Sequence, residues 1–192
     1  MPAIAPLHPW KWPSSPWERL HIDFAGPFMD RMFLVVVDVL SIWPEIVEMK
    51  TTTATKTIEV LRSIFSRNGI PVQVVSDNGS QFASEEFGIF MKNNGIKHYK
   101  SAPYHPATNV QAERFVQSFK NSMKAMKENA KDLNQKLSNF LLMYRNTPHT
   151  TTNESPAKLF LGRELRTRLS LLKPNTQLNV IRCPLLSKVR EI

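Results

Sequence analysis

The chain has 192 residues and a mass of 22.0 kDa, enough for one hydrophobic core with short extensions. A hydrophobic content of 42% and a mean hydropathy of -0.28 exclude a disordered or membrane-embedded chain, and the lack of a long apolar run or leader predicts a soluble, intracellular protein. The 25 Lys and Arg residues outnumber the 16 Asp and Glu residues, which favours a polyanionic partner; a solvated basic surface is the alternative.

The first part of the chain predicts an extended segment followed by an antiparallel sheet. Residues 1–16 contain five prolines, which favour an extended lead-in over a folded unit. Three runs rich in β-branched and aromatic residues follow at 19–24, 32–39 and 43–49, separated by turn residues that include Gly26 and Pro27. Their close spacing predicts three antiparallel strands.

Helices and strands then alternate. Helical periodicity covers residues 55–67 and 84–93, and short β-rich runs follow at 72–76 and 96–100. Because strands separated by helices generally lie parallel, the sheet is expected to be mixed and the fold to be α/β.

Mainly helical sequence completes the predicted domain. After a loop at 101–108, a long helix is expected from Asn109, a second at 131–145, and a short one that opens at Ser155 and Pro156 and ends at Gly162. The chain is therefore divided into a Pro-rich lead-in at 1–16, one core domain at 17–168 and a basic tail at 169–192.

Three acidic residues occupy local sequences that are suited to hold a carboxylate in place. Asp23 lies inside a short apolar run, Asp77 ends a β-branched run, and Glu113 is near the start of the long helix. An acid inside an apolar strand is costly unless it is paired or binds a metal. Hard divalent ions prefer carboxylates, and a pair of them can promote phosphodiester chemistry. If the first and fourth strands are neighbours, Asp23 and Asp77 can meet and Glu113 can approach from its helix.

Other interpretations remain open for each acid. Asp77 precedes Asn-Gly and has the sequence of a turn residue, and Glu113 can simply complement a helix dipole. Asp38 also lies in an apolar strand, so the residues alone do not separate it from Asp23. The single cysteine, Cys183, and five widely spaced histidines make a zinc site an unfavoured alternative.

Three ordered motifs resemble the integrase core of Ty3/Gypsy-type retrotransposons and retroviruses. They are Trp-Glu-Arg-Leu-His-Ile-Asp-Phe-Ala-Gly-Pro at 17–27, Val-Val-Ser-Asp-Asn-Gly at 74–79 with Gln-Phe at 81–82, and Tyr-His-Pro-Ala-Thr-Asn at 104–109 with Gln-Ala-Glu-Arg at 111–114. Thirty-five residues lie between Asp77 and Glu113, the spacing of that family. The resemblance extends over residues 17–168.

The resemblance implies an RNase H-like fold, with a five-stranded mixed sheet flanked by helices. It also implies a metal-dependent polynucleotidyl transferase and endonuclease that uses two Mg²⁺ or Mn²⁺ ions held by Asp23, Asp77 and Glu113, with Asp38 outside the triad. In such enzymes, water first attacks near the end of the element's DNA, and the freed 3′-hydroxyl then attacks target DNA. The implied partners are DNA and further copies of the same chain. The implied location, when the protein acts on DNA, is the nucleus. The implied DNA-binding residues are Asn109, Gln117, Lys120, Lys124 and Lys127, and the implied supporting-loop residues are Asn78, Tyr104, His105 and Pro106.

Some features depart from the family pattern. Val110 stands where relatives usually have glycine, and a β-branched residue closes backbone conformations that glycine allows. The family's zinc module and C-terminal DNA-binding domain have no counterpart in the sequence, which predicts an isolated core. A catalytically impaired or domesticated core that binds nucleic acid or protein is therefore the second hypothesis, and a general RNase H-type nuclease is the third.

Overall fold

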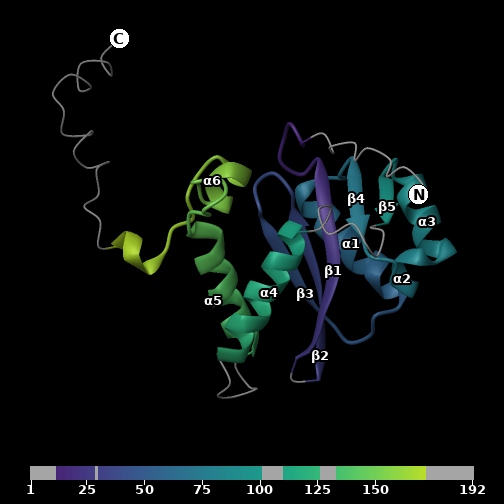
Figure 1. The fold of residues 1–192 in the computed structure, drawn as a ribbon, viewed down its shortest axis with the longest axis horizontal. Helices are drawn as coiled ribbons and strands as arrows, with labels where there is room; N and C mark the ends of the chain where they lie inside the picture. The colour runs from purple at the N-terminus through teal and green to yellow at the C-terminus, as the bar shows by residue number, and fades with distance from the viewer. Residues whose placement is uncertain (1–11, 29, 101–109, 126–132, 172–192) are drawn as a thin grey trace, which may run out of the picture.

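The computed structural model describes residues 12–28, 30–100, 110–125 and 133–171, and of residues 110–113, 124, 125 and 169 it describes only the backbone. Five strands form one mixed sheet in the order β3-β2-β1-β4-β5, with helices on both of its faces (Figure 1). The predicted α/β class and five-stranded mixed sheet are confirmed.

The antiparallel half of the sheet consists of β1 (Arg19–Phe28), β2 (Arg31–Asp38) and β3 (Pro44–Met49). The prediction of a turn at Gly26 and Pro27 was wrong, because both lie inside β1, at a register irregularity between Ala25 and Phe28. An irregularity of this kind accommodates a proline, which has no N–H to donate. Gly26 has a φ of 138°, and an added Cβ would lie 2.8 Å from the carbonyl oxygen of Arg31, so only glycine fits there.

The parallel half of the sheet consists of β4 (Gln73–Ser76), which pairs with β1, and β5 (Lys97–Lys100), which pairs with β4. The intervening helices are α1 (Ala54–Asn68), α2 (Ser80–Ala83) and α3 (Glu85–Asn93). The sequence predicted these elements to within about a residue at each end, apart from the short α2. Side chains of Thr53 and Ser84 cap α1 and α3 by accepting from Lys56 N and Phe87 N.

The C-terminal helices are α4 (Val110–Ala125), α5 (Leu133–Asn146) and α6 (Pro156–Leu161), followed by one 3₁₀ turn at Arg168–Leu171. The short helix agrees with its predicted signals: Ser155 accepts from Lys158 N, and Gly162 ends the helix with a φ of 70°. None of the helices in the described ranges is both long and apolar enough to span a bilayer. Most of the predicted lead-in and tail falls outside the described residues.

Alternation along β2 divides the core between the two faces of the sheet. Leu34 and Val36 pack in one cluster with side chains of α1 and α3, whereas Phe33, Val35 and Val37 pack in another with side chains of α4 and α5. The second cluster includes Phe115, Val116, Phe119 and Met123 of α4, all buried. The sheet is therefore the middle of three layers, and α4 lies across β1 and β2.

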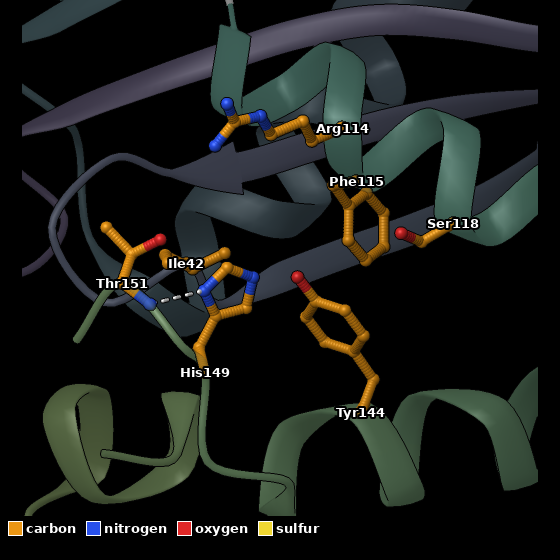
Figure 2. A pocket seen from close by; sticks show the side chains of 7 residues that line it. All are labelled: Ile42, Arg114, Phe115, Ser118, Tyr144, His149 and Thr151. Carbon is orange, nitrogen blue, oxygen red and sulfur yellow. Dashed lines mark hydrogen bonds between the residues drawn. The ribbon is translucent and has the colours of Figure 1, made fainter. Parts of the chain in front are cut away.

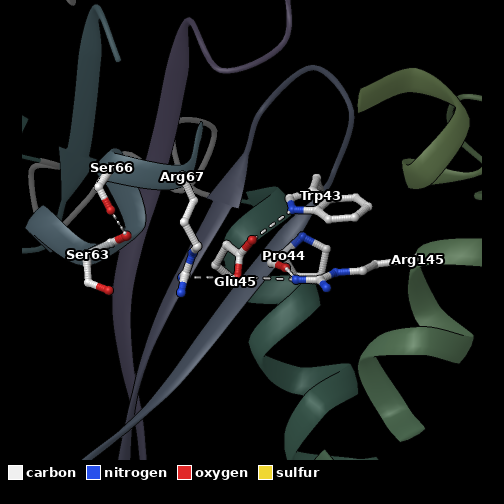
Figure 3. A network of polar contacts seen from close by, with 7 residues as sticks. All are labelled: Trp43, Pro44, Glu45, Ser63, Ser66, Arg67 and Arg145. Atoms are coloured by element: carbon white, nitrogen blue, oxygen red, sulfur yellow. Dashed lines mark hydrogen bonds and ion pairs between the residues drawn. The ribbon is translucent and has the colours of Figure 1, made fainter. Parts of the chain in front are cut away.

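A polar network joins α5 and α1 to the start of β3 (Figure 3). The Arg145 guanidinium lies 4.1 Å from the centre of the Trp43 ring, donates to Pro44 O at 2.7 Å and is 3.3 Å from Glu45 Oε2. Arg67 of α1 approaches the same Glu45 oxygen at 3.9 Å. Burial lowers the pKa of Arg145, and Glu45 opposes that shift by favouring the charged form. The network ties elements from both faces of the sheet together.

Candidate metal and nucleic-acid site

The parallel pairing of β1 and β4 brings together the residues that directly precede Asp23 and Asp77. His21 pairs with Val75, and the same offset carried two residues further brings Asp23 opposite Asp77. The predicted adjacency of the first and fourth strands is thus confirmed. Asp23 lies within β1, and Asp77 directly follows the last residue of β4.

Asp23 is on the face of the sheet that α4 covers. Side chains alternate along a strand, so Asp23 shares its face with Ala25, which belongs to the core cluster of α4 and α5. The opposite face carries Ile22, which packs with α1 and α3. The Asp23 carboxylate is partly exposed, and its Oδ1 accepts from the backbone nitrogen of Phe24 at 2.7 Å.

Asp77 is exposed and stands at the start of a turn. Its Oδ1 accepts from Gly79 N at 2.9 Å, the contact that the Asp-Asn-Gly sequence predicts for a turn residue. A Cβ added at Gly79 would lie 3.0 Å from that same oxygen. The small residue therefore leaves room for the carboxylate next to the backbone.

A hydrogen bond from β5 supports the end of β4. His98 Nε2 lies 2.9 Å from Ser76 Oγ, and the same hydroxyl donates to Asp77 O at 2.8 Å. The His98 ring also packs edge-on against Phe87, with 5.1 Å between ring centres. Burial lowers the pKa of His98, with a smaller effect of Lys100 in the same direction. No sequence motif indicates this contact, because only the β4–β5 pairing brings the two residues together.

Glu113 is the fourth residue of α4, so it lies in the first turn of the helix as predicted. Its side chain is outside the described part of the structure, as is that of Lys124, and Asn109, Lys127 and the predicted supporting loop at 104–106 lie wholly outside it. Among the described side chains, which do not include that of Glu113, no group of three His, Cys, Asp or Glu residues is arranged to hold a metal ion. The complete triad therefore stays a prediction.

The predicted DNA-binding stripe on α4 points away from the core where it is described. Gln117 is exposed, and its Nε2 donates to Asn121 Oδ1 at 3.0 Å, while Lys120 is partly exposed. Phe115, Val116 and Phe119 are buried on the other side of the helix. Asn78, from the predicted supporting loop, is exposed after β4.

Asp38, the rival of Asp23, has a different environment. It is fully buried and accepts hydrogen bonds from Trp17 N at 2.9 Å, Ser41 N at 2.8 Å and Ser41 Oγ at 2.5 Å. Burial raises the pKa of Asp38, and the hydrogen bonds from Ser41 act against that shift. Asp38, the last residue of β2, therefore holds the turn that leads to β3, a role that its separation of three residues from Ser41 could have indicated.

Comparison with known proteins identifies the family. Residues 13–106 match the family model described as "Integrase core domain". An uncharacterized protein of Caenorhabditis elegans is 41% identical over 192 residues, which is 100% of this chain and 15% of that protein. The Pro-Pol polyprotein of feline foamy virus is 30% identical over 155 residues, which is 78% of this chain and 13% of that protein. The chain thus spans only a small part of either curated relative.

Solved structures agree with the fold. A chain of the simian T-cell lymphotropic virus intasome superposes with a TM-score of 0.71 at 21% identity, over 82% of this chain and 59% of its own length. The HTLV-2 integrase catalytic core domain, solved in complex with magnesium, superposes with a TM-score of 0.64 at 20% identity. The match covers 77% of this chain and 98% of that domain. The mixed sheet with α4 and α5 on one face is therefore the RNase H-like fold of these integrase cores. The chain belongs to the integrase core domain family of retroviruses and retroelements.

Proposed function

We propose that the chain is the catalytic core of a retroelement integrase, a polynucleotidyl transferase that processes the 3′ end of the element's DNA and joins it to target DNA. The observation that carries the proposal is the β1–β4 register, which pairs His21 with Val75, each two residues before one of the two acids, Asp23 and Asp77. Asp23 lies on the side of the sheet that α4 covers. Glu113, in the first turn of α4, is the third acid. DNA is the proposed substrate, and the nucleus is the proposed compartment in which the chain acts on it.

The acids fit hard divalent cations. Their donors are carboxylate oxygens, which Mg²⁺ and Mn²⁺ prefer, and the site has neither thiolate nor imidazole among its proposed ligands. Asp77 is exposed and Asp23 partly exposed, so both are accessible from solvent. We assign Asp23, Asp77 and Glu113 as the residues that hold two ions. Such ions activate the attacking oxygen and stabilise charge on the leaving oxygen.

The other residues of the site position the substrate and the acids. Gln117 lies one helical turn after Glu113, and Lys120 lies two turns after it, so both side chains extend the same exposed stripe of α4. We assign these two residues to DNA contacts. Gly79 N holds Asp77 Oδ1 by its hydrogen bond, which orients that carboxylate. Asn109, Lys124 and Lys127 continue the proposed DNA surface, and Tyr104, His105 and Pro106 are proposed to support it.

The experiment is Mn²⁺-dependent disintegration of a branched DNA substrate by wild type and Asp77→Asn. Asp30→Asn is the matched control, because Asp30 is exposed in the turn before β2 and asparagine tolerates its φ of 57°. We expect activity in wild type and Asp30→Asn and its loss in Asp77→Asn, with all three proteins folded by circular dichroism. Equal activity in all three, or none in any, contradicts the catalytic assignment.

Val110, the first residue of α4, favours a second candidate: a core that binds nucleic acid without catalysis. A β-branched residue there restricts the backbone that leads into Glu113. This candidate predicts DNA binding that weakens steeply with salt, together with no heat of Mg²⁺ binding at millimolar metal. If the wild type lacks disintegration activity and the Val110→Gly variant has it, Val110 is the residue that impairs the core.

We also propose that the chain forms homo-oligomers. The HTLV-2 core domain has been solved in trimeric and dimeric forms, and the chain aligns with most of that domain. Light scattering after size-exclusion chromatography tests this directly, and a monomer at all accessible concentrations contradicts it.

A further inference from the structure

A small pocket lies beside α4, apart from the proposed metal site. It is formed between α4, α5, the turn before β3 and the loop between α5 and α6 (Figure 2). Ile42 and Phe115 supply its apolar wall, and the remaining lining residues are polar: Arg114, Ser118, Tyr144, His149 and Thr151.

The polar groups of the pocket are mainly donors. Arg114 supplies a permanent positive charge, and Ser118 and Tyr144 supply hydroxyl groups. Burial raises the pKa of Tyr144 to about 12, so its hydroxyl keeps its proton at neutral pH. No carboxylate lines the pocket in the described part of the chain. A set of this kind suits an anion and not a cation.

The loop before α6 orients His149. Its backbone nitrogen donates to Glu154 O at 3.1 Å, and its carbonyl oxygen accepts from Asn153 N at 2.7 Å. Its ring Nδ1 accepts from Thr151 N at 3.4 Å, which leaves the proton of the neutral ring on Nε2. In Figure 2 the ring and the Tyr144 hydroxyl both point toward α4, so the Nε2–H is a further donor to the pocket.

Neither Arg114 nor the Tyr144 hydroxyl has a hydrogen-bond or ion-pair partner among the described residues. Tyr144 packs its ring edge-on against Phe115, with 4.8 Å between ring centres, which holds the hydroxyl in position. Ile42 keeps a φ of 60°, a conformation that is costly for a β-branched residue, so the turn at the pocket wall is held by its surroundings. Among the described residues these donors therefore have no competing acceptor, and the Tyr144 hydroxyl is held in position.

The pocket lies on the flank of the proposed DNA stripe. Arg114 and Ser118 are four residues apart and share one side of α4, whereas Gln117 and Lys120 share another. Successive residues of a helix are rotated by about 100°, so the two sides adjoin each other. A DNA strand that contacts the stripe thus has neighbouring phosphates within reach of the flank.

We propose that this pocket is a phosphate site that takes one backbone phosphate of DNA bound along α4. Arg114 neutralises the charge, and Ser118, Tyr144 and His149 donate hydrogen bonds to the phosphate oxygens. The proposal rests on the proposed function for the source of the phosphate but not on the metal site or on catalysis.

The first test uses inorganic phosphate alone, with the His149 ring signals followed by NMR and assigned by their loss in His149→Gln. We expect a saturable shift in wild type and in Asp77→Asn, and a weaker one in Tyr144→Phe. Tyr99→Phe is the matched control, because Tyr99 lies on β5, and it should titrate like wild type. No saturable shift in wild type, or equal binding by Tyr144→Phe, overturns the site.

The second test measures the salt dependence of binding to a short duplex. Loss of one phosphate contact is expected to reduce the slope of log K against log salt by about 0.9 in Arg114→Gln. Arg62→Gln makes the same chemical change on α1, on the opposite face of the sheet, and should keep the wild-type slope. An unchanged slope in Arg114→Gln, with phosphate binding intact, overturns DNA as the source. Loss of disintegration in Asp77→Asn is independent of both results.

Discussion

The carboxylate of Asp38 accepts two hydrogen bonds from Ser41, one from the backbone nitrogen at 2.8 Å and one from the hydroxyl at 2.5 Å. A third comes from Trp17 N at 2.9 Å, so the segment before β1 and the turn after β2 are joined through one buried acid. These contacts explain why an acid can lie in an apolar strand without binding a metal. They also separate Asp38 from Asp23, which the residue pattern did not.

Ser41→Ala is expected to lower the free energy of unfolding by about 1.5 to 3 kcal/mol, because it removes a hydrogen bond to a buried charged group. Urea denaturation measures the change. Ser63→Ala is the control: Ser63 is exposed on α1, and its loss should change stability by less than about 0.5 kcal/mol. Equal effects of the two substitutions would remove the argument for Asp38 as the organiser of the turn.

The stability contributed by Asp38 should depend on pH in the direction opposite to that of an ordinary paired acid. Burial raises its folded pKa above the ordinary value of 3.8, so the folded protein retains a proton that the unfolded chain releases. The free energy of unfolding therefore falls as pH rises from 3.8 through the folded pKa. Urea unfolding of wild type and Asp38→Asn at steps of pH isolates this contribution. If the free energy of unfolding of wild type minus that of Asp38→Asn stays constant or grows as pH rises, the raised pKa of Asp38 is contradicted.

His98 should make stability depend on pH in the opposite sense. Burial lowers its folded pKa below 6.5, so the unfolded chain binds the proton more readily. The contribution of the neutral ring is complete above pH 6.5 and is lost as pH falls through the folded pKa. His98→Gln should flatten this part of the stability profile, measured by thermal unfolding. An NMR titration that places the pKa of His98 at or above 6.5 would refute the assignment.

Arg145→Met is expected to destabilise the fold by about 2 to 3 kcal/mol. The substitution keeps an apolar chain over Trp43 but leaves Glu45, which is only 17% exposed, with Arg67 at 3.9 Å as its remaining cation in the described network. Chemical denaturation measures the loss. Lys56→Met, which breaks the exposed pair with Glu59, should cost less than about 0.5 kcal/mol. A comparable loss in the two variants would show that burial of the network is unimportant.

Asp23→Asn and Asp77→Asn should each weaken Mn²⁺ binding about tenfold or more, because each removes a charged oxygen ligand. Isothermal titration calorimetry measures the affinity, and circular dichroism confirms folding. Asp30→Asn should bind like wild type. If Asp23→Asn binds the ion normally while Asp77→Asn does not, Asp23 is not a ligand and the proposed pair is wrong.

Local pattern was sufficient for most elements of this fold. A run of β-branched and aromatic residues located β2, helical spacing located α1 and α4, and the signals at Pro156 and Gly162 located α6, since each depends on interactions within a few residues. Pattern failed at Gly26 and Pro27, where pairing with β2 extends β1 past residues that usually end a strand. Long-range pairing there outweighs local preference.

The sequence by itself determined the family motifs, the order of the elements and the three candidate acids. Only the tertiary structure showed the surroundings of the two acids in apolar strands: Asp38 is fully buried and accepts from Ser41, whereas Asp23 is partly exposed. It also decided that β1 pairs with β4 up to His21 and Val75, two residues before Asp23 and Asp77, and that Arg114, Tyr144 and His149 line one pocket. These relationships join residues far apart in the chain, and strand register and helix packing set them through contacts that a linear pattern does not contain.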